Sequence, residues 1–408
     1  MEYTQVPGGV CAAKGFSAAG VYCGIRKNHT KSDLALIQAE VRCAAAGVFT
    51  TNKVCGAPVK VDRAHLADGY AQAIIINSGN ANTCAANGVA LANECCGLVA
   101  EALHLSAEDV LPASTGVIGQ PMTIEPFARG IPAAAKALNS TCAGSTAAAE
   151  AIMTTDTQKK EYAVEFVLGG KRCTLGAIGK GSGMIAPNMA TMLEFYTTDV
   201  AITPALLHEA LAAVVPDTYN QLSVDLDTST NDTLILMASG LAGNPPITEE
   251  NEDYHVFLAA LLHIAAHMCA LHASDGEGAS HLITCEVAHA PDKKIARAVA
   301  KSVVCSNLFK AAVFGRDANW GRILCAIGYT PGDFSIDHVC VRLASAAGEV
   351  YVCENAAYHP YSEDEAATVL AEHDILVKVD MGAGESAAKA WGCDLTYDYV
   401  KINGDYRT

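Results

Sequence analysis

The pattern of apolar and polar residues predicts strands at the start of the chain and a mixture of helices and strands after it. Residues 1–80 contain short apolar runs such as Ala73-Ile74-Ile75-Ile76, which is closed by a polar turn at 77–80. Runs of β-branched residues bounded by turn residues are typical of strands. From about Ala85 to His104 apolar residues recur every three or four positions, which predicts an amphipathic helix.

The rest of the chain continues to alternate between the two patterns. A second helix is expected near Ile124–Leu138, and three more are expected to begin at Thr203-Pro204, after Pro245-Pro246 (ending near His272), and at about Gly384. Strands are expected at Asp109–Pro112, Glu161–Leu168, Arg172–Ile178 and Thr191–Thr197. No G-x-G-x-x-G follows a first strand, and no phosphate-binding loop is present. We therefore expect an α/β fold in which layers of β-sheet are sandwiched between helices.

Composition narrows the class of protein and of partner. The 408 residues are 51% hydrophobic and 17% charged, which is typical of a compact globular protein. A net charge of −17 argues against a nucleic-acid or anionic-membrane partner, and an acidic substrate would need local cations. No apolar run approaches the roughly eighteen residues that span a bilayer. The first residues lack the basic and apolar regions of a signal peptide, so we expect a cytoplasmic protein.

The cysteines and histidines do not indicate a disulfide framework or a metal site. The 16 cysteines are scattered mostly singly through apolar segments, and we expect them to be reduced core residues, for example Cys23, Cys43, Cys173 and Cys325. No C-x-x-C pair occurs. His263 and His267 are four apart, but Ile264 stands where a zinc protease carries its glutamate. We expect no bound metal and interpret this histidine pair as part of a helix surface.

The segment Lys180–Leu193 contains the strongest candidate for catalysis, because Thr191 follows the small residue Ala190. If the peptide bond between them breaks, the freed α-amine lies on the same residue as the hydroxyl and can act as its base. Such an amine has a pKa of about 7.7 to 8.0. The Thr191 hydroxyl can also attack the Ala190 carbonyl, which gives an ester that water can open. On its own, however, this segment is more typical of a glycine-rich loop entering a buried strand.

Other polar clusters are compatible with a binding site and also with ordinary turns. Thr115-Gly116 places a hydroxyl beside a glycine amide, two donors that could form an oxyanion hole or simply a strand-to-helix turn. The hydroxyl and carboxylate clusters at 153–157 and 225–233 suit polar ligands or helix caps. Glu277 lies between two glycines, which suits an ammonium group or a solvated turn. The tail at 399–408 can fold into a pocket or fray.

Together these segments resemble the ornithine acetyltransferase family, also called glutamate N-acetyltransferase, and the resemblance spans nearly the whole chain. The residues that carry it are Gly47-Val48-Phe49-Thr50-Thr51-Asn52, Asn77-Ser78-Gly79-Asn80-Ala81-Asn82, Ser114-Thr115-Gly116-Val117-Ile118-Gly119, Lys180–Leu193, Asp227-Thr228-Ser229-Thr230-Asn231-Asp232 and Asn319-Trp320-Gly321-Arg322-Ile323-Leu324.

The resemblance implies a self-cleaving precursor with a fold similar to that of N-terminal-nucleophile aminopeptidases. The chain would be cut between Ala190 and Thr191 into an α chain of residues 1–190 and a β chain of residues 191–408. These chains would interleave in a shared α/β core and assemble as a heterotetramer of two α and two β chains.

The resemblance also implies a role for particular residues. Thr191 would carry the acetyl group, and Thr115 and Gly116 would form the oxyanion hole. Lys180 would supply the cation that an acidic substrate requires. The substrate contacts implied by the resemblance are Thr154, Lys180, Thr191, Glu277, Asn403 and Thr408.

The implied reaction transfers acetyl from N2-acetyl-L-ornithine to L-glutamate through an acetyl-threonine, in arginine biosynthesis. No cofactor is required, although some members also use acetyl-coenzyme A as donor. From the residues alone, an aminopeptidase or amidase with water as acceptor, or a non-enzymatic binding protein, stays open. Two departures from the family pattern, Leu226 in place of glycine and Ala318 in place of proline, bear on the shape of two loops and on acceptor preference.

Overall fold

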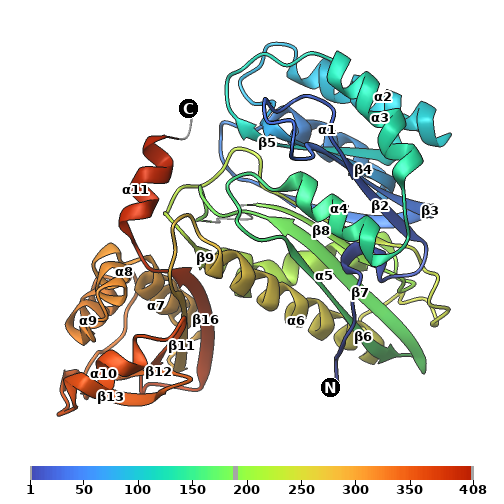
Figure 1. The fold of residues 1–408 in the computed structure, drawn as a ribbon. Helices are drawn as coiled ribbons and strands as arrows, with labels where there is room; N and C mark the ends of the chain where they lie inside the picture. Colours follow the sequence, from blue (N-terminus) through green and yellow to red (C-terminus); the bar gives the residue numbers. More distant parts are fainter. Residues whose placement is uncertain (1, 187–191, 406–408) are drawn as a thin grey trace. The chain divides into compact units, whose positions relative to one another are not determined.

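The structure is a computed structural model that describes residues 2–186 and 192–405. Two compact units are present, and each is described here by itself (Figure 1). Unit 1 comprises the described residues up to Gly181, from Met192 to Val215 and from Thr228 to Met268. Unit 2 comprises Ser182 to Ala186, Pro216 to Asp227 and the described residues from Cys269 onward. Each unit therefore contains described residues from both sides of position 190.

Unit 1 contains one mixed β-sheet. In spatial order its strands are β1 (Thr4–Gln5), β6 (Lys160–Leu168), β7 (Lys171–Lys180), β8 (Leu193–Thr198), β10 (Thr233–Ala238), β3 (Leu34–Phe49), β4 (Tyr70–Asn80) and β5 (Val110–Val117), while β2 (Phe16–Val21) pairs with β3. The pairs β8–β10 and β4–β5 are parallel, and the other pairs are antiparallel.

Helices cover the faces of this sheet (Figure 1). They are α1 (Ala57–His65), α2 (Gly88–Leu103), α3 (Glu125–Ala137), α4 (Cys142–Ile152), α5 (Pro204–Val214) and α6 (Glu252–Ser274), the last six residues of which belong to unit 2. Helix α4 packs against β2 and β3, α5 packs against β3, and α1 and α2 pack against β5.

The run Ala73-Ile74-Ile75-Ile76 shows why strands in this sheet lack polar alternation. Ile74 and Ile76 belong to a core that also contains residues of α4, whereas Ala73 and Ile75 belong to a second core with residues of α2 and α3. A strand that buries both faces needs apolar side chains at every position. The continuous apolar run is therefore explained by two cores on opposite faces of β4.

Unit 2 is built around a second sheet. The order of its strands is β14 (Ala357–Tyr358), β13 (Gly348–Glu354), β12 (Cys340–Ser345), β15 (Asp374–Asp380), β11 (Leu282–Ala290), β16 (Ser386–Cys393) and β9 (Leu222–Ser223). Its helices are α7 (Lys293–Cys305), α8 (Asn307–Phe314), α9 (Trp320–Gly328), α10 (Glu363–Val369) and α11 (Tyr397–Gly404).

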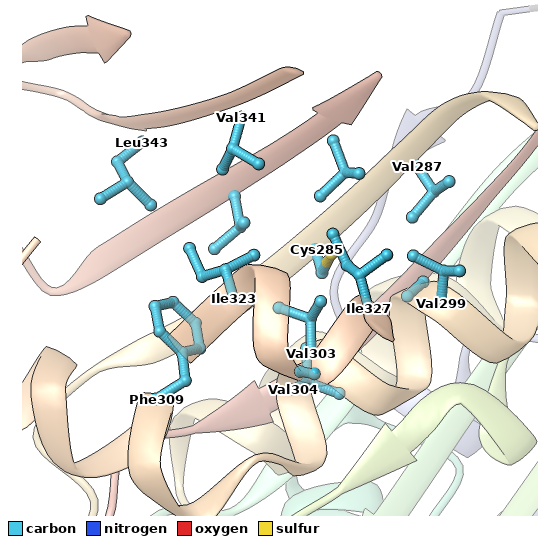
Figure 2. Close-up of a cluster of buried hydrophobic side chains, with 14 of the residues drawn as sticks. Cys285, Val287, Val299, Val303, Val304, Phe309, Ile323, Ile327, Val341 and Leu343 are labelled. Carbon is cyan, nitrogen blue, oxygen red and sulfur yellow. The ribbon is translucent and has the colours of Figure 1, made fainter. Parts of the chain in front are cut away.

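The core of unit 2 joins this sheet to three helices. Figure 2 shows Val299 and Val303 of α7, Phe309 of α8 and Ile323 of α9 gathered against the side chains of β11 and β12. Within α7 the buried apolar residues recur every three or four positions, so they lie on one face of the helix. The helix starts at Asp292, whose Oδ1 accepts a hydrogen bond of 2.8 Å from the Ile295 amide.

The α/β class and most of the predicted elements are confirmed. Helices α2, α3, α5 and α6 occur where the periodicity indicated them, and so do β6, β7 and β8. Three predictions were wrong. Helix α1 lies inside a region expected to contain strands, β5 continues to Val117 instead of ending at Pro112, and the helix expected from Gly384 is the strand β16.

Helix α6 corrects the statement that no apolar run approaches the length of a membrane span. Among the described residues, α6 is the one helix that is long and apolar enough to cross a membrane by length and composition alone. Within its most apolar window, 50% is buried inside the protein. A core helix meets the same test, so this finding is weak support for a membrane location. Its histidines are stacked on tyrosines: His263 on Tyr3 and His267 on Tyr162, with ring centroids 4.4 and 3.8 Å apart.

All 16 cysteines lie in the described residues and are free thiols. Cys23, Cys43 and Cys173 are buried as expected, and burial raises the pKa of the Cys43 thiol to about 12. Cys325 is exposed, so its assignment to the core was wrong. It lies on α9, where the neighbouring Ile323 and Ile327 occupy the buried positions.

Candidate active site

The predicted oxyanion residues lie on β5, side by side with a second polar segment on β4. In this parallel pair Ser78 is the partner of Thr115, and Gly79 is the partner of Gly116. Residues 77–80 were expected to form a turn after a strand, and Thr115-Gly116 were expected to follow one. In the structure residues 77–80 are the last residues of β4, and Thr115 and Gly116 lie near the end of β5. The two segments therefore pair with each other at the edge of the sheet.

Gly116 cannot carry a side chain in this ladder. Its φ is +128°, and a Cβ there would lie 2.3 Å from the carbonyl carbon of Gly79. Glycine tolerates this conformation and this close approach at no steric cost. The glycine therefore sets the distance between β4 and β5 and presents a bare backbone beside the Thr115 hydroxyl.

Lys180 points at this hydroxyl. Its Nζ donates a hydrogen bond of 3.2 Å to Thr115 Oγ1, and the lysine is only 8% exposed. A threonine hydroxyl that accepts one hydrogen bond can still donate its own proton. Because chained hydrogen bonds polarise one another, the ammonium makes this O–H a better donor to an oxyanion.

Asp156 ties together the backbones of two further candidates. Its Oδ2 accepts a hydrogen bond of 2.9 Å from the Thr154 amide, and its Oδ1 accepts one of 2.7 Å from the Gly181 amide. Oδ1 also forms an ion pair of 2.7 Å with Lys160, and both side chains are almost fully buried. Thr154 and the residue after Lys180 are therefore held on one carboxylate.

Two lysines influence the ionisation of Asp156. Burial alone would raise the pKa of Asp156, but the neighbouring Lys160 and Lys180 outweigh it and hold this pKa well below the ordinary value. The carboxylate is therefore charged at neutral pH, and two ammonium groups face it. Such a site favours a substrate that brings its own carboxylate.

A second buried acid, Asp232, lies close enough to Lys180 for the two charges to interact. Asp232 is 1% exposed, and burial raises the pKa of its carboxyl well above the ordinary value despite the opposing charge of Lys180. Burial therefore favours the neutral form of this carboxyl. Glu194 is fully buried on β8 and its carboxylate lies beside Gly179 of β7, so this end of the sheet holds buried ionisable groups of both kinds.

Asn231 braces the strand that carries Thr115. Its Nδ2 donates hydrogen bonds to the carbonyls of Ala81 at 2.6 Å and Ser114 at 2.9 Å, and its Oδ1 accepts one of 2.5 Å from Thr83. Within the polar cluster 225–233, which composition left open between ligand binding and turn formation, Asn231 thus has a structural role in unit 1. The roles of Asp156, Lys160 and Asn231 were missed from sequence, because the bonds of Asp156 to Gly181 and of Asn231 to Ala81 and Ser114 join distant parts of the chain, and the ion pair of Lys160 with Asp156 has no motif that marks it.

Glu277 and Asn403 form a separate group in unit 2. Asn403 Nδ2 donates a hydrogen bond of 2.7 Å to Glu277 Oε2, and Glu277 is 8% exposed. A Cβ at Gly183 would lie 2.3 Å from the Glu277 carboxyl carbon, so glycine is required to leave room for this side chain. Of the two alternatives left open for Glu277, the solvated turn is therefore excluded, because Glu277 is a buried acid with a defined partner.

The last element among the described residues is a helix. Residues 397–404 form α11, so the expectation of a frayed tail fails for this part. Tyr399 of this helix donates a hydrogen bond of 3.4 Å to Asp225. Burial, together with the nearby carboxylates of Asp225 and Glu277, raises the pKa of Tyr399 above its ordinary value, so the phenol stays protonated at neutral pH.

The predicted site residues thus form one group in unit 1 and one in unit 2, and three of them lie outside the described residues. Unit 1 brings Thr115, Gly116 and Lys180 together and links Thr154 to them through Asp156. Unit 2 joins Glu277 to Asn403. The nucleophile Thr191, its neighbour Ala190 and the terminal Thr408 lie outside the described residues. Among residues 2–186 and 192–405, no group of three or more His, Cys, Asp or Glu could hold a metal ion.

The two departures from the family pattern take different forms. Leu226 has φ +71° and is 49% exposed, a conformation in which glycine is at ease and leucine is strained. Ala318 is buried directly before Asn319, whose side chain caps α9 by accepting a hydrogen bond of 3.3 Å from the Arg322 amide. The motif at 319–324 is therefore the start of a helix in unit 2.

Comparison with known proteins places the chain in a family. The sequence model of the ArgJ family matches residues 17–408. The chain is 50% identical over 396 residues to the arginine biosynthesis bifunctional protein ArgJ of Caldanaerobacter subterraneus subsp. tengcongensis, covering 97% of both chains. It is 48% identical over 403 residues to the protein of that name from Symbiobacterium thermophilum, covering 98% of this chain and 99% of the relative. The chain belongs to the ArgJ family.

A solved structure is also similar to part of the chain. The crystal structure of arginine biosynthesis bifunctional protein ArgJ from Bacillus halodurans is 42% identical, and the match covers 52% of this chain and 97% of that one, with a TM-score of 0.49. The predicted likeness to N-terminal-nucleophile aminopeptidases stays a prediction.

Proposed function

We propose that this protein transfers the acetyl group of N2-acetyl-L-ornithine to L-glutamate through an acetyl ester on Thr191. Membership of the ArgJ family over nearly the whole chain carries this proposal. The names of the relatives place them in arginine biosynthesis. The Lys180–Thr115 contact supports it, because it joins an oxyanion donor to a cation that suits a carboxylate-bearing substrate.

The reaction has two balanced halves. In the first, the Thr191 oxygen attacks the acetyl carbonyl, the amide bond breaks, and ornithine leaves with the proton that the hydroxyl gave up to the α-amine. In the second, the amine of glutamate attacks the ester, N-acetylglutamate leaves, and the threonine oxygen regains a proton. Thr115 and the Gly116 amide stabilise the oxyanion in both halves. Lys180 and Thr154 contact one part of the substrate, and Glu277, Asn403 and Thr408 contact others.

Processing precedes this chemistry in our proposal. The Thr191 hydroxyl attacks the Ala190 carbonyl, the acyl group moves from nitrogen to oxygen, and water opens the ester. The products are an α chain of residues 1–190 and a β chain of residues 191–408, which assemble as a heterotetramer of two α and two β chains in the cytoplasm. The chemistry needs no cofactor, and acetyl-coenzyme A is an alternative acetyl donor that would add amino-acid N-acetyltransferase activity.

Two measurements test the proposal. Intact mass spectrometry of the purified protein should show two polypeptides that begin at residues 1 and 191. Ornithine release from N-acetylornithine should depend on glutamate after the first turnover. Release at full rate without glutamate would instead identify a hydrolase, and a single uncut chain with no release would point to a binding protein. An assay with acetyl-coenzyme A and glutamate distinguishes the two donors.

A further inference from the structure

The carboxylate of Asp225 gathers backbone donors from a segment far away in sequence. Oδ2 accepts a hydrogen bond of 2.6 Å from the Met184 amide, and Oδ1 accepts one of 2.8 Å from the Ile185 amide. Oδ1 also accepts the amide of Asp227 at 3.2 Å, and Tyr399 of α11 donates to Oδ2 at 3.4 Å. All of these residues belong to unit 2. One side chain thus binds two consecutive amides from a distant part of the chain.

The same segment is held by further contacts within unit 2. The Ile185 carbonyl accepts hydrogen bonds from the amides of Val224 at 2.7 Å and Asp225 at 3.3 Å, and the Ile185 side chain is 1% exposed. The Ser182 carbonyl accepts a hydrogen bond of 2.8 Å from the Glu277 amide. Residues 182–186 are therefore fixed at both ends, and the carboxylate of Asp225 provides the side-chain part of this anchor.

Backbone strain marks both sides of this anchor. Met184 has φ +55° and Leu226 has φ +71°, although neither is glycine. Their side chains are 44% and 49% exposed, so burial of apolar surface offsets little of the strain. Strained non-glycine residues persist where the surrounding contacts over-determine them, and such positions cluster at functional sites. Here the amide of Met184 and the amide of Asp227, the residue after Leu226, both bind the Asp225 carboxylate.

We propose that Asp225 is a positioning residue for self-cleavage: it holds Met184 and Ile185, the latter five residues before Ala190, and it keeps these two residues bound within unit 2 once the Ala190–Thr191 bond is broken. The inference rests on the self-cleavage proposed above and adds a residue that is neither nucleophile nor oxyanion donor. Nothing in it requires Asp225 to touch the reacting atoms.

The physical reason lies in the chain ends on either side of the bond. Downstream, the Met192 carbonyl accepts a hydrogen bond of 2.9 Å from the Thr233 amide in unit 1. Upstream, Asp225 fixes Met184 and Ile185. Fixing the chain a few residues before a reacting bond removes conformations that would otherwise compete with the reactive one. After cleavage the upstream part becomes a chain terminus, and termini fray unless hydrogen bonds hold them.

Variants at Asp225 test this role. Asp225→Ala removes the acceptor, and Asp225→Asn keeps the shape and one acceptor oxygen. We expect self-cleavage, followed on denaturing gels after a pulse of synthesis, to slow about tenfold in Asp225→Ala and less in Asp225→Asn, in line with the loss of proximity. Asp225→Glu should recover part of the rate. Asp333→Asn, a change at an exposed acid elsewhere in unit 2, should match the wild type.

Amide hydrogen exchange separates positioning from general loss of folding. In the mature wild type the Met184 and Ile185 amides should stay protected. In Asp225→Asn they should exchange at least tenfold faster, while the amides of β11 and α7 remain unchanged. Equal protection and equal cleavage rates in all three Asp225 variants would overturn the inference while leaving the proposed function intact. A wild type that never cleaves would instead remove the processing step on which both rest.

Discussion

Lys180 donates a hydrogen bond of 3.2 Å to the hydroxyl of Thr115, although the two residues are 65 positions apart in the chain. The contact joins the end of β7 to the end of β5 within unit 1. It places the predicted cation against the predicted oxyanion donor, and Asp156 adds the backbone of Thr154 to the same cluster.

Removing the Thr115 hydroxyl should slow turnover. We expect Thr115→Ala to lower kcat about a hundredfold, because one oxyanion donor is lost while the other remains. Thr115→Ser keeps the hydroxyl and should stay within a few fold of the wild type. Steady-state ornithine release measures both. Unchanged turnover in the alanine variant would assign Thr115 to structure alone.

Lys180 should act mainly on substrate capture. We expect Lys180→Met to raise the KM for N-acetylornithine about thirtyfold, because a hydrogen bond to a charged group contributes roughly 2 kcal/mol. Lys159→Met is a matched control on an exposed lysine of the same region, and its KM should not change. A loss of thermal stability as large as the loss of binding would contradict the assignment.

Thr191 should be required for both processing and transfer. Thr191→Ala should leave one polypeptide of 42.4 kDa on a denaturing gel and no acetyl transfer, because the nucleophile and the cleavage site coincide. Thr191→Ser keeps a hydroxyl and an α-amine and should still be cut. Normal fragments from the alanine variant would end the proposal that this residue cuts the chain.

Replacing the strained leucine should stabilise the protein. A left-handed leucine costs about 1–2 kcal/mol, and the greater freedom of glycine in the unfolded chain offsets roughly half of that gain. We therefore expect Leu226→Gly to raise the free energy of unfolding by about 0.5–1 kcal/mol. Leu308→Gly, at an exposed position inside α8, should have the opposite sign. Urea unfolding of both variants provides the comparison.

Asp62 should make stability fall as the pH rises. Burial raises the pKa of this carboxyl well above its ordinary value, and neither oxygen has a hydrogen-bond partner among the described residues. The unfolded chain releases the proton near pH 4. Between that pH and the higher folded pKa, the folded state keeps a proton that the unfolded state has lost, so raising the pH destabilises the fold.

Neutralising Asp62 should remove this dependence. Asp62→Asn should be more stable than the wild type at pH 8, by about 1.4 kcal/mol for each unit by which the folded pKa exceeds the unfolded one. The two proteins should converge as the pH falls to 4 and below, where the carboxyl becomes protonated in the unfolded chain as well as in the folded one. Thermal unfolding between pH 4 and 8 measures the difference, with Asp333→Asn as the exposed control. Parallel curves for Asp62→Asn and wild type would refute the assignment.

Helices and strands were predicted correctly where the apolar residues followed a single helical or strand periodicity. They were predicted wrongly where tertiary contacts outweighed the secondary-structure propensity of the segment. Helix α2 was found from its stripe of apolar residues. The alanine-rich run 386–393 favours a helix by propensity, yet it forms β16 because β11 and β9 pair with it on either side. Helix α1 was missed because its valines suggest a strand, although Pro58 suits the first turn of a helix.

The candidate site was predictable in its residue types but not in its connections. Thr115, Gly116 and Lys180 were named from motifs and a resemblance, and their contact depends on strand pairing that no local pattern contains. In the sequence, Asp156 is distinguished only by its place in a polar cluster. Its ion pair with Lys160 and its hydrogen bond from the Gly181 amide depend on the folding of β6 and β7.

The tight approach at Gly116 limits how its amide can be studied. Every genetically encoded replacement adds at least one carbon, and that carbon would fall 2.3 Å from the Gly79 carbonyl carbon, so a mutant would report a displaced strand and not a missing donor. The hydrogen bond from the Gly116 amide therefore has to be tested by changing its acceptor, the acetyl oxygen of the substrate. A thioacetyl donor, whose sulfur is a poorer acceptor than oxygen, would weaken the hydrogen bonds from both the Gly116 amide and the Thr115 hydroxyl and leave the polypeptide untouched; the effect that persists in Thr115→Ala would then belong to the amide.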